Sequence, residues 1–413
     1  MGLLDRREFL IATAAAGVAL ASGSAALTRR ESTVGLPPSP PGLPLGQHSW
    51  EAVLREDRFG NPQLPTYNRL LFFDLADRPS NDAARHVERS FRSLEHRYAW
   101  AASGAVFAVG WGPRYFRALG VPPPVADPTA LSTFEAPELG THQVVMHLAS
   151  DRVEVLDEIE GAVVRGARLP GIHGDVSLAP ALRWRETRTG FTGPGLAAAH
   201  QRVHGIPEGH PVPPDSPMFM GFRSGFRKNQ ATEEAVTITD GPLAGGTTMH
   251  VSQSNLALDN WYRLFDTRAR AHRMFSPGLT TQQVDELGDE APHAATEVER
   301  HAEQRGVVGH LQLAAMARRG DRPIILRRDF NTVDGDVAGL HFVAYQRSIA
   351  DFEATRKAMN GADVVDLNPA IKPRINNGIK EFFTVERRAN FVVPPRPLRS
   401  FPLLPGRDLG ERS

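Results

Sequence analysis

Residues 339–347, GLHFVAYQR, contain an apolar run of strand length, and residues 349–354, IADFEA, open a helix directly after it. The first half of the chain repeats this order. Residues 67–75, YNRLLFFDL, have the composition of a strand, and in residues 84–94 apolar side chains recur at spacings of three and four, which gives one apolar helix face. Strands and helices therefore alternate in both halves of the chain.

Further apolar runs complete the pattern of each half. The remaining predicted strands lie at residues 105–110, 142–148, 182–187, 245–253, 324–326 and 390–395. Helices are predicted near residues 152–159 and from residue 258 onward. Because each half then has the element order of a ferredoxin-like unit, the sequence predicts an α+β fold of two such halves, with antiparallel sheets and flanking helices.

The composition excludes several classes of function. The chain has 413 residues, with 47 Lys and Arg against 47 Asp and Glu, and no cysteine. The balanced charge gives no electrostatic case for a nucleic-acid or anionic-membrane partner. Without cysteine there are no disulfides, no iron–sulfur clusters and no covalently attached haem. The sequence also lacks a phosphate-binding loop, a His-Glu-x-x-His zinc motif and a Gly-x-Ser-x-Gly hydrolase motif.

The N-terminus carries Arg6 and Arg7 ahead of an alanine-rich apolar run that ends near Ala21. This order predicts a twin-arginine export signal over residues 1–31; the alternative is an accidental arginine pair before a short apolar helix. The run is shorter than the roughly 20 apolar residues of an ordinary transmembrane helix. We therefore expect export by the twin-arginine translocase, to the periplasm, the cell surface or the outside of the cell. That route carries folded cargo, which suits a protein that acquires a cofactor before export.

Residues 32–64 follow the predicted signal and are rich in proline, most of all at residues 35–44, GLPPSPPGLP. Proline favours extended geometry and cannot donate to a β-ladder. This segment is predicted as a linker or as an arm that follows the surface. The N-terminal half is then assigned to residues 65–235 and the C-terminal half to residues 236–405.

Four segments of the chain are similar to segments of one known family. They are residues 109–116 (VGWGPRYF), 325–328 (ILRR), 339–347 and 391–395 (FVVPP). Together with a glycine-bracketed turn at residues 221–225, GFRSG, their order resembles the dye-decolourising (DyP-type) peroxidase family. The resemblance implies two ferredoxin-like halves of the dimeric α/β-barrel type, and haem b held non-covalently in the C-terminal half.

Carried over by position, the resemblance implies that His310 is the proximal ligand of the haem iron and that Arg327 is the distal arginine. On composition alone, a structural role is the better interpretation of His310, which is one of 15 histidines. Arg328 is expected on the opposite face of an extended segment, as a solvated or propionate-pairing charge. An error of one residue between the two arginines stays open.

Further haem contacts are expected from the turn at residues 221–225, the residues just after it, and the predicted strand at residues 339–347. They are Arg223, Gly225, Arg227 and Phe342. A solvated surface turn explains the basic residues equally well. The implied activity is that of an oxidoreductase that uses peroxide to oxidise a small organic reductant. The identity of the reductant and the formation of a homo-oligomer stay open.

Ser224 departs from the family, whose turn carries aspartate at this position. A hydroxyl is a poor proton acceptor at neutral pH, although it can orient a water, and losing an acid–base group typically removes about 10²–10⁴ of the rate. Asp329, which replaces the family's usual glycine, is interpreted either as a substitute catalytic carboxylate or as a surface residue. We expect weakened peroxidase activity. The alternative is an exported, non-catalytic protein that keeps the fold without haem.

Overall fold

The computed structural model describes residues 36–172, 174–280 and 297–410. The predicted export signal at residues 1–31 lies outside the described residues. Residues Leu36–Ser413 form one compact unit. Within the described part of this unit, no helix has both the length and the apolar character needed to span a membrane.

The N-terminal half confirms the predicted alternation of strands and helices. Its main elements are β3 (Tyr67–Leu75), α1 (Asn81–Arg97), β4 (Val106–Trp111), α2 (Pro113–Leu119), β6 (Val144–Ser150), α3 (Val153–Arg165) and β7 (Leu182–Phe191). The apolar stripe predicted in residues 84–94 is the buried face of α1. This helix begins after Ser80, whose hydroxyl accepts a hydrogen bond from the backbone N–H of Ala83 at 3.1 Å.

The C-terminal half repeats the pattern with more helices. Its main elements are β8 (Thr247–Leu256), α5 (Asp259–Leu264), α6 (Thr267–Met274), α8 (Val298–Arg305), α9 (His310–Ala315), β12 (Phe330–Thr332), β13 (Gly339–Gln346), α10 (Ile349–Asn360) and β14 (Phe383–Val393). Shorter elements of the chain are β1 (Arg55–Glu56), β2 (Pro62–Gln63), β5 (Glu138–Leu139), α4 (Leu196–Ala199), β9 (Arg318–Arg319), β10 (Arg322–Pro323) and β11 (Leu326–Arg327). The strand predicted at residues 324–326 is thus reduced to a two-residue pairing.

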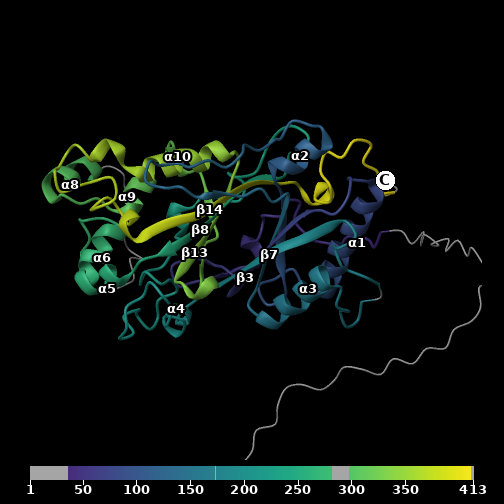
Figure 1. The fold of residues 1–413 in the computed structure, drawn as a ribbon, viewed down its shortest axis with the longest axis horizontal. Helices are drawn as coiled ribbons and strands as arrows, with labels where there is room; N and C mark the ends of the chain where they lie inside the picture. Colours follow the sequence, from purple (N-terminus) through teal and green to yellow (C-terminus); the bar gives the residue numbers. More distant parts are fainter. Residues whose placement is uncertain (1–35, 173, 281–296, 411–413) are drawn as a thin grey trace, which may run out of the picture. The chain divides into compact units, whose positions relative to one another are not determined.

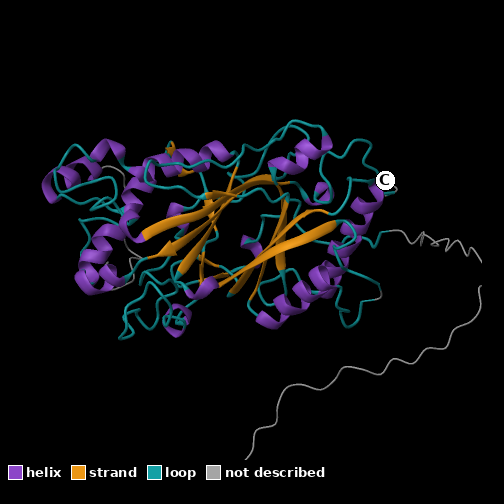
Figure 2. Ribbon diagram, viewed as in Figure 1, coloured by secondary structure: helices purple, strands orange, loops and turns teal. Residues whose placement is uncertain are grey.

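Eight strands form a closed, antiparallel ring in the order β3, β7, β12, β13, β8, β14, β4 and β6, with β6 returning to β3. The two halves meet at narrow junctions. One is the single pair between Asn331 of β12 and Phe191 of β7, and the other joins Val392 of β14 to Trp111 of β4. The ring confirms the predicted α+β fold of antiparallel sheets with flanking helices (Figure 2). Apolar residues of both halves form its interior.

Side chains alternate between the inside and the outside of this ring, as the period of a strand requires. In β3, Leu70 and Phe72 belong to the apolar cluster of the interior, whereas Leu71 and Phe73 pack outward in the cluster that includes α1 and α3. In β13, Tyr345 points inward, and Phe342 lies outward with α10. Helices α1, α2 and α3 therefore cover the N-terminal half, while α9 and α10 cover the C-terminal half (Figure 1).

The proline-rich segment from residue 36 lies along this unit as an arm. The side-chain amide of Gln47 donates to the backbone carbonyl of Pro394 at 2.8 Å, and its carbonyl oxygen accepts from the backbone N–H of Val109 at 2.9 Å. Trp50 is fully buried in the interior of the ring. The arm therefore contributes to the core, which a free linker would not.

Candidate functional site

A cavity with about 1250 Å³ of empty space, part of it open to solvent, lies on the outer face of the C-terminal half. The outward side chains of β8, β13 and β14 form its floor. Helices α9 and α10 and residues 218–226 form its walls. The lining is mainly apolar, and it includes Phe342, which the sequence predicted as a contact of a bound group.

The extended segment 326–331 supplies the polar residues of one wall. Arg327 and Asp329 line the cavity, whereas Leu326 and Phe330 point into the interior of the ring. This alternation is set by the pairing with β13, in which Arg327 faces Ala344 and Phe330 faces His341. Of the two adjacent arginines, Arg327 is therefore the one on the cavity side.

Arg328 points into the ring, on the face opposite to Arg327. Its guanidinium pairs with the carboxylate of Glu233 at 2.8 Å and lies 4.1 Å from the centroid of the Trp50 ring. The prediction of opposite faces is confirmed. The prediction that Arg328 contacts a cofactor is wrong for this cavity, because the side chain is 1% exposed and is already paired on the other side of the strand.

His310 is the first residue of α9. The preceding Gly309 is required there, since a Cβ atom at this position would lie 2.0 Å from the backbone oxygen of Phe275. The imidazole faces the cavity, and neither ring nitrogen forms a hydrogen bond with another described residue. Burial, followed by the positive charge of Arg327, lowers the pKa of His310 to about 3. The ring is therefore neutral at physiological pH, with a free lone pair.

Asp329 is a buried carboxylate, with 7% of its surface exposed, so the surface interpretation of this residue is wrong. The hydroxyl of Ser224 donates to its Oδ2 at 3.3 Å, and Nη1 of Arg327 lies 4.0 Å from the same oxygen. Its Oδ1 has no hydrogen-bond partner among the described residues. Burial outweighs Arg327 and raises the pKa of Asp329 to about 6.

The turn at residues 221–225 contributes only part of what the sequence predicted. Ser224 and Arg223 line the cavity, and Arg223 also pairs with Asp57 at 2.6 Å. Gly225 lies outside this cavity and lines a neighbouring one. Arg227 is exposed and pairs with Glu56 at 2.6 Å, so its predicted contact with a cofactor is wrong because the side chain is drawn toward the N-terminal arm.

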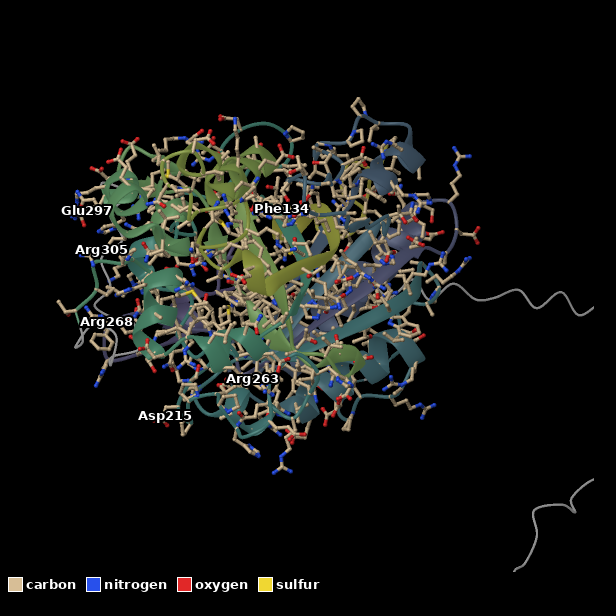
Figure 3. The ribbon with its side chains drawn as sticks, turned by 60° about the vertical axis from the view of Figure 1, so that its left-hand side comes forward. Phe134, Asp215, Arg263, Arg268, Glu297 and Arg305 are labelled. Carbon is tan, nitrogen blue, oxygen red and sulfur yellow. The ribbon has the colours of Figure 1, made fainter. Side chains whose placement is uncertain are left out.

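Three cations of the cavity were not predicted from the sequence: Arg356, Lys380 and Arg388. Arg388 donates two hydrogen bonds of 3.0 Å to the buried carboxylate of Glu135, which also accepts from Arg356 at 3.1 Å. The ring of Phe134, beside Glu135, lies over elements of the C-terminal half (Figure 3).

Lys380 donates to the backbone carbonyls of Met359 and Asn360 at 3.0 and 2.5 Å. Burial, followed by Arg356, lowers the pKa of Lys380 to about 7. A sequence signal for part of this wall did exist. Residues 352, 355, 356 and 359 of α10 all line the cavity, at the spacing of one helix face. Glu135 lies in a connecting segment and Lys380 begins a three-residue 3₁₀ helix, Lys380–Phe382, and both are too short to carry such a periodicity.

A second cavity, with about 910 Å³ of empty space including open solvent, adjoins the first. The two cavities share Ser224, Arg327 and Asp329 in their walls. The second one extends from these residues toward the hairpin β1–β2 and is lined in part by polar side chains, among them Glu51 and Gln63. The buried carboxylate therefore stands between an apolar chamber and a more polar passage.

Comparison with known proteins supports the fold expectation. A model of a family of unknown function, DUF7405, matches residues 65–395, and no curated protein matches the chain in sequence. The structure is similar to a dye-decolorizing peroxidase from Bacteroides thetaiotaomicron, with a TM-score of 0.55 and 15% identity over 87% of this chain and 100% of that one.

Two further solved structures of dye-decolorizing proteins are similar to this one to about the same degree. A heme complex of a variant of DypB from Rhodococcus jostii has a TM-score of 0.55 and 16% identity, over 86% of this chain and 98% of that one. A dye-decolorizing protein from V. cholerae has a TM-score of 0.53 and 14% identity, over 85% and 98%. At these identities the likeness shows the fold, which is that of the dye-decolorizing peroxidases.

Proposed function

This chain belongs to the family of unknown function DUF7405, and we propose that it is a haem-dependent peroxidase whose acid–base residue is Asp329. One observation carries the proposal: His310, Arg327 and Asp329 line the same apolar cavity. They supply, in one place, a free imidazole, a fixed cation and a carboxylate that titrates near neutral pH. The likeness to dye-decolorizing peroxidases supports the proposal at the level of the fold.

The residues of the cavity fit haem b. The described residues contain no cluster of three or more His, Asp or Glu side chains that could hold a bare metal ion. Haem needs only one axial nitrogen from the protein, and His310 offers it without an existing hydrogen bond to break. Apolar side chains suit the macrocycle, and Lys380, whose ammonium donates to two backbone carbonyls, suits a propionate.

Haem, when bound, supplies the iron that takes up peroxide and its oxidising equivalents. His310 would hold that iron through a ring nitrogen, which burial keeps unprotonated. The guanidinium of Arg327 would stabilise the negative charge that develops as the O–O bond breaks. Asp329 accepts a proton from one peroxide oxygen and returns it to the other. A pKa of about 6 suits both steps, because neither protonation state is strongly disfavoured near neutral pH.

Ser224 is assigned a supporting part in this chemistry. Its hydroxyl donates to Oδ2 of Asp329 and thereby holds one carboxylate oxygen. Oδ1, which has no partner among the described residues, is then the oxygen that exchanges the proton with peroxide. The second cavity reaches the same residues from the polar side, so we assign it as the path by which peroxide enters.

We propose export by the twin-arginine route on the evidence of Arg6, Arg7 and the apolar run behind them. A protein that must bind a non-covalent cofactor before it leaves the cytoplasm has reason to cross the membrane folded. The reducing substrate is an organic molecule small enough to reach the apolar cavity or its edge.

The test is the absorption spectrum of protein expressed with haem supply. We expect a Soret band in the wild type, and its loss or shift in His310→Ala. The matched control is His204→Ala, which removes a side chain that is 82% exposed and is expected to leave the band unchanged. A peroxide titration of the wild type should then change the spectrum. A wild type without a Soret band would overturn the proposal in favour of a non-catalytic protein with this fold.

A further inference from the structure

A small side compartment adjoins the main cavity and is lined by residues of α9, α10 and the hairpin β9–β10. Its empty space is about 480 Å³, including open solvent. The two spaces share the side chains of Leu311, Arg327, Phe342, Thr355 and Met359. A ligand in the side compartment would therefore lie next to whatever occupies the cavity. The residues that line only the side compartment, such as Asn229, Arg318 and Ile324, have no part in the proposed peroxidase chemistry.

Most of the compartment wall is apolar. Leu311 and Ala314 come from α9, Met359 comes from α10, and Ile324 and Ile325 come from the segment before β11. These side chains enclose a small apolar space that is partly open to solvent. Apolar walls of this kind bind the body of a ligand but do not fix its orientation, which depends on the polar groups.

The charged side chains that line the compartment, Arg318 and Arg327, are both arginines. Arg318 donates to the backbone carbonyls of Asp321 and Lys228 at 2.5 and 3.2 Å, and to Oδ1 of Asn229 at 3.4 Å. Within the described part of the chain, Arg318 forms no ion pair with a carboxylate. The amide nitrogen of Asn229 is buried without a hydrogen-bond partner among the described residues. The residues that line the compartment include no aspartate or glutamate.

This arrangement leaves a positive charge and a buried N–H donor facing an apolar space. Buried donors are normally satisfied, so an unpaired one beside an arginine without an acidic partner indicates an acceptor that comes from outside the chain. A carboxylate satisfies both groups, since it accepts from the guanidinium and from the amide at once. The apolar walls then require that the carboxylate be attached to a small hydrophobic body.

We propose that the side compartment is a binding site for a small aromatic carboxylate, with Arg318 and Asn229 holding the carboxylate and the apolar walls holding the ring. The site itself does not depend on haem. Its consequence for selectivity, a preference for anionic ring compounds beside the reaction centre, rests on the proposed peroxidase function.

Fluorine NMR of 4-fluorobenzoate tests the proposal, on protein purified with and without haem supply. We expect saturable binding to the wild type, and binding at least roughly 10-fold weaker for the neutral 4-fluorobenzamide and for Arg318→Gln, because a hydrogen-bonded charge contributes about 1.5–3 kcal/mol. The matched control is Arg319→Gln. Arg319 is the neighbouring arginine, it is 65% exposed and paired with Asp351, and its loss should leave the affinity within about twofold of the wild type.

A second variant keeps the test independent of folding defects in Arg318→Gln. Asn229→Asp places a carboxylate beside Arg318, which should compete with the ligand and weaken binding by a similar factor. The proposal is overturned if 4-fluorobenzoate does not bind saturably, if 4-fluorobenzamide binds as well, or if Arg319→Gln loses as much affinity as Arg318→Gln. Failure of the proposed peroxidase function would appear separately, as a missing Soret band with benzoate binding unchanged.

Discussion

Replacing Asp329 by asparagine is expected to stabilise the protein and to remove most of its peroxidase activity. The carboxylate is 7% exposed, and its Oδ1 has no partner among the described residues. Burial raises its pKa from 3.8 to about 6, although Arg327 opposes the shift. The folded protein therefore holds a proton more tightly than the unfolded chain does. Ionisation of this group costs stability.

The size and the sign of the change in the free energy of unfolding follow from the difference between the folded and unfolded pKa of Asp329. The difference between 3.8 and about 6, at about 1.36 kcal/mol for each pH unit, amounts to about 3 kcal/mol. Because the folded state binds more protons between these pH values, the free energy of unfolding of the wild type falls as the pH rises from about 4 to about 6, and this contribution is constant above that. Asp329→Asn removes the ionisation and should be more stable above pH 6 by up to about 3 kcal/mol, with little difference near pH 4.

Urea unfolding of the haem-free protein between pH 4 and pH 8, followed by tryptophan fluorescence, measures the effect. Asp215→Asn is the control, because Asp215 is an exposed carboxylate at the periphery of the molecule (Figure 3) and lines neither cavity. Peroxide turnover of the haem-loaded variant should fall by about 10²–10⁴. The reasoning is refuted if Asp329→Asn gains no stability at pH 8, or if it keeps the same loss of stability between pH 4 and pH 6.

Three other predictions concern the exchange of acids, the buried charges and export. The double variant Ser224→Asp, Asp329→Asn should turn over peroxide at least about tenfold faster than Asp329→Asn. Ser224→Asp alone should gain no activity, because it places two carboxylates side by side. Steady-state peroxide kinetics of the three variants measure both effects. Glu135→Leu should lower the free energy of unfolding by about 3–5 kcal/mol, because it leaves the buried Arg356 and Arg388 without their carboxylate. In the same urea assay, the control Glu138→Leu, which replaces an exposed glutamate, should change the free energy of unfolding by less than about 1 kcal/mol. Replacing Arg6 and Arg7 by lysine should retain the protein in the cytoplasm, which cell fractionation against the wild type detects; equal export of both would contradict the signal.

The local elements were predictable, and the long-range closure was not. The apolar runs at residues 67–75 and 340–345 identify β3 and β13 because strand composition and period are properties of neighbouring residues. The ring closes through single pairs, such as Asn331 with Phe191, which leave no signal in either segment. The α+β class could therefore be predicted from pattern, whereas the barrel type of the fold was implied only by the resemblance.

In the candidate site, too, the local features could be predicted from the sequence and the long-range contacts could not. Period two predicts that Arg327 and Arg328 face opposite ways, but only the register against β13 decides which one faces the cavity. The burial of Asp329 could not be predicted, because carboxylates are rarely buried without a charged partner and no local pattern marks one that is. Lys380 becomes a wall residue because the end of α10 offers carbonyls to its ammonium, a contact across about 20 positions of sequence.

The position of the acid explains why serine stands in the turn. The hydroxyl of Ser224 lies 3.3 Å from Oδ2 of Asp329, and two carboxylates at that distance cannot both ionise. Once a carboxylate is present at residue 329, the turn must therefore carry a neutral group, and a hydroxyl is the neutral group that can also donate to it. Residue 329 lies in the short extended segment between β11 and β12, and the pairing of Arg327 with Ala344 and of Phe330 with His341 fixes the backbone on both sides of it. Under the proposed function, Ser224 is then the neutral partner of an acid at residue 329, and it does not by itself indicate lost activity.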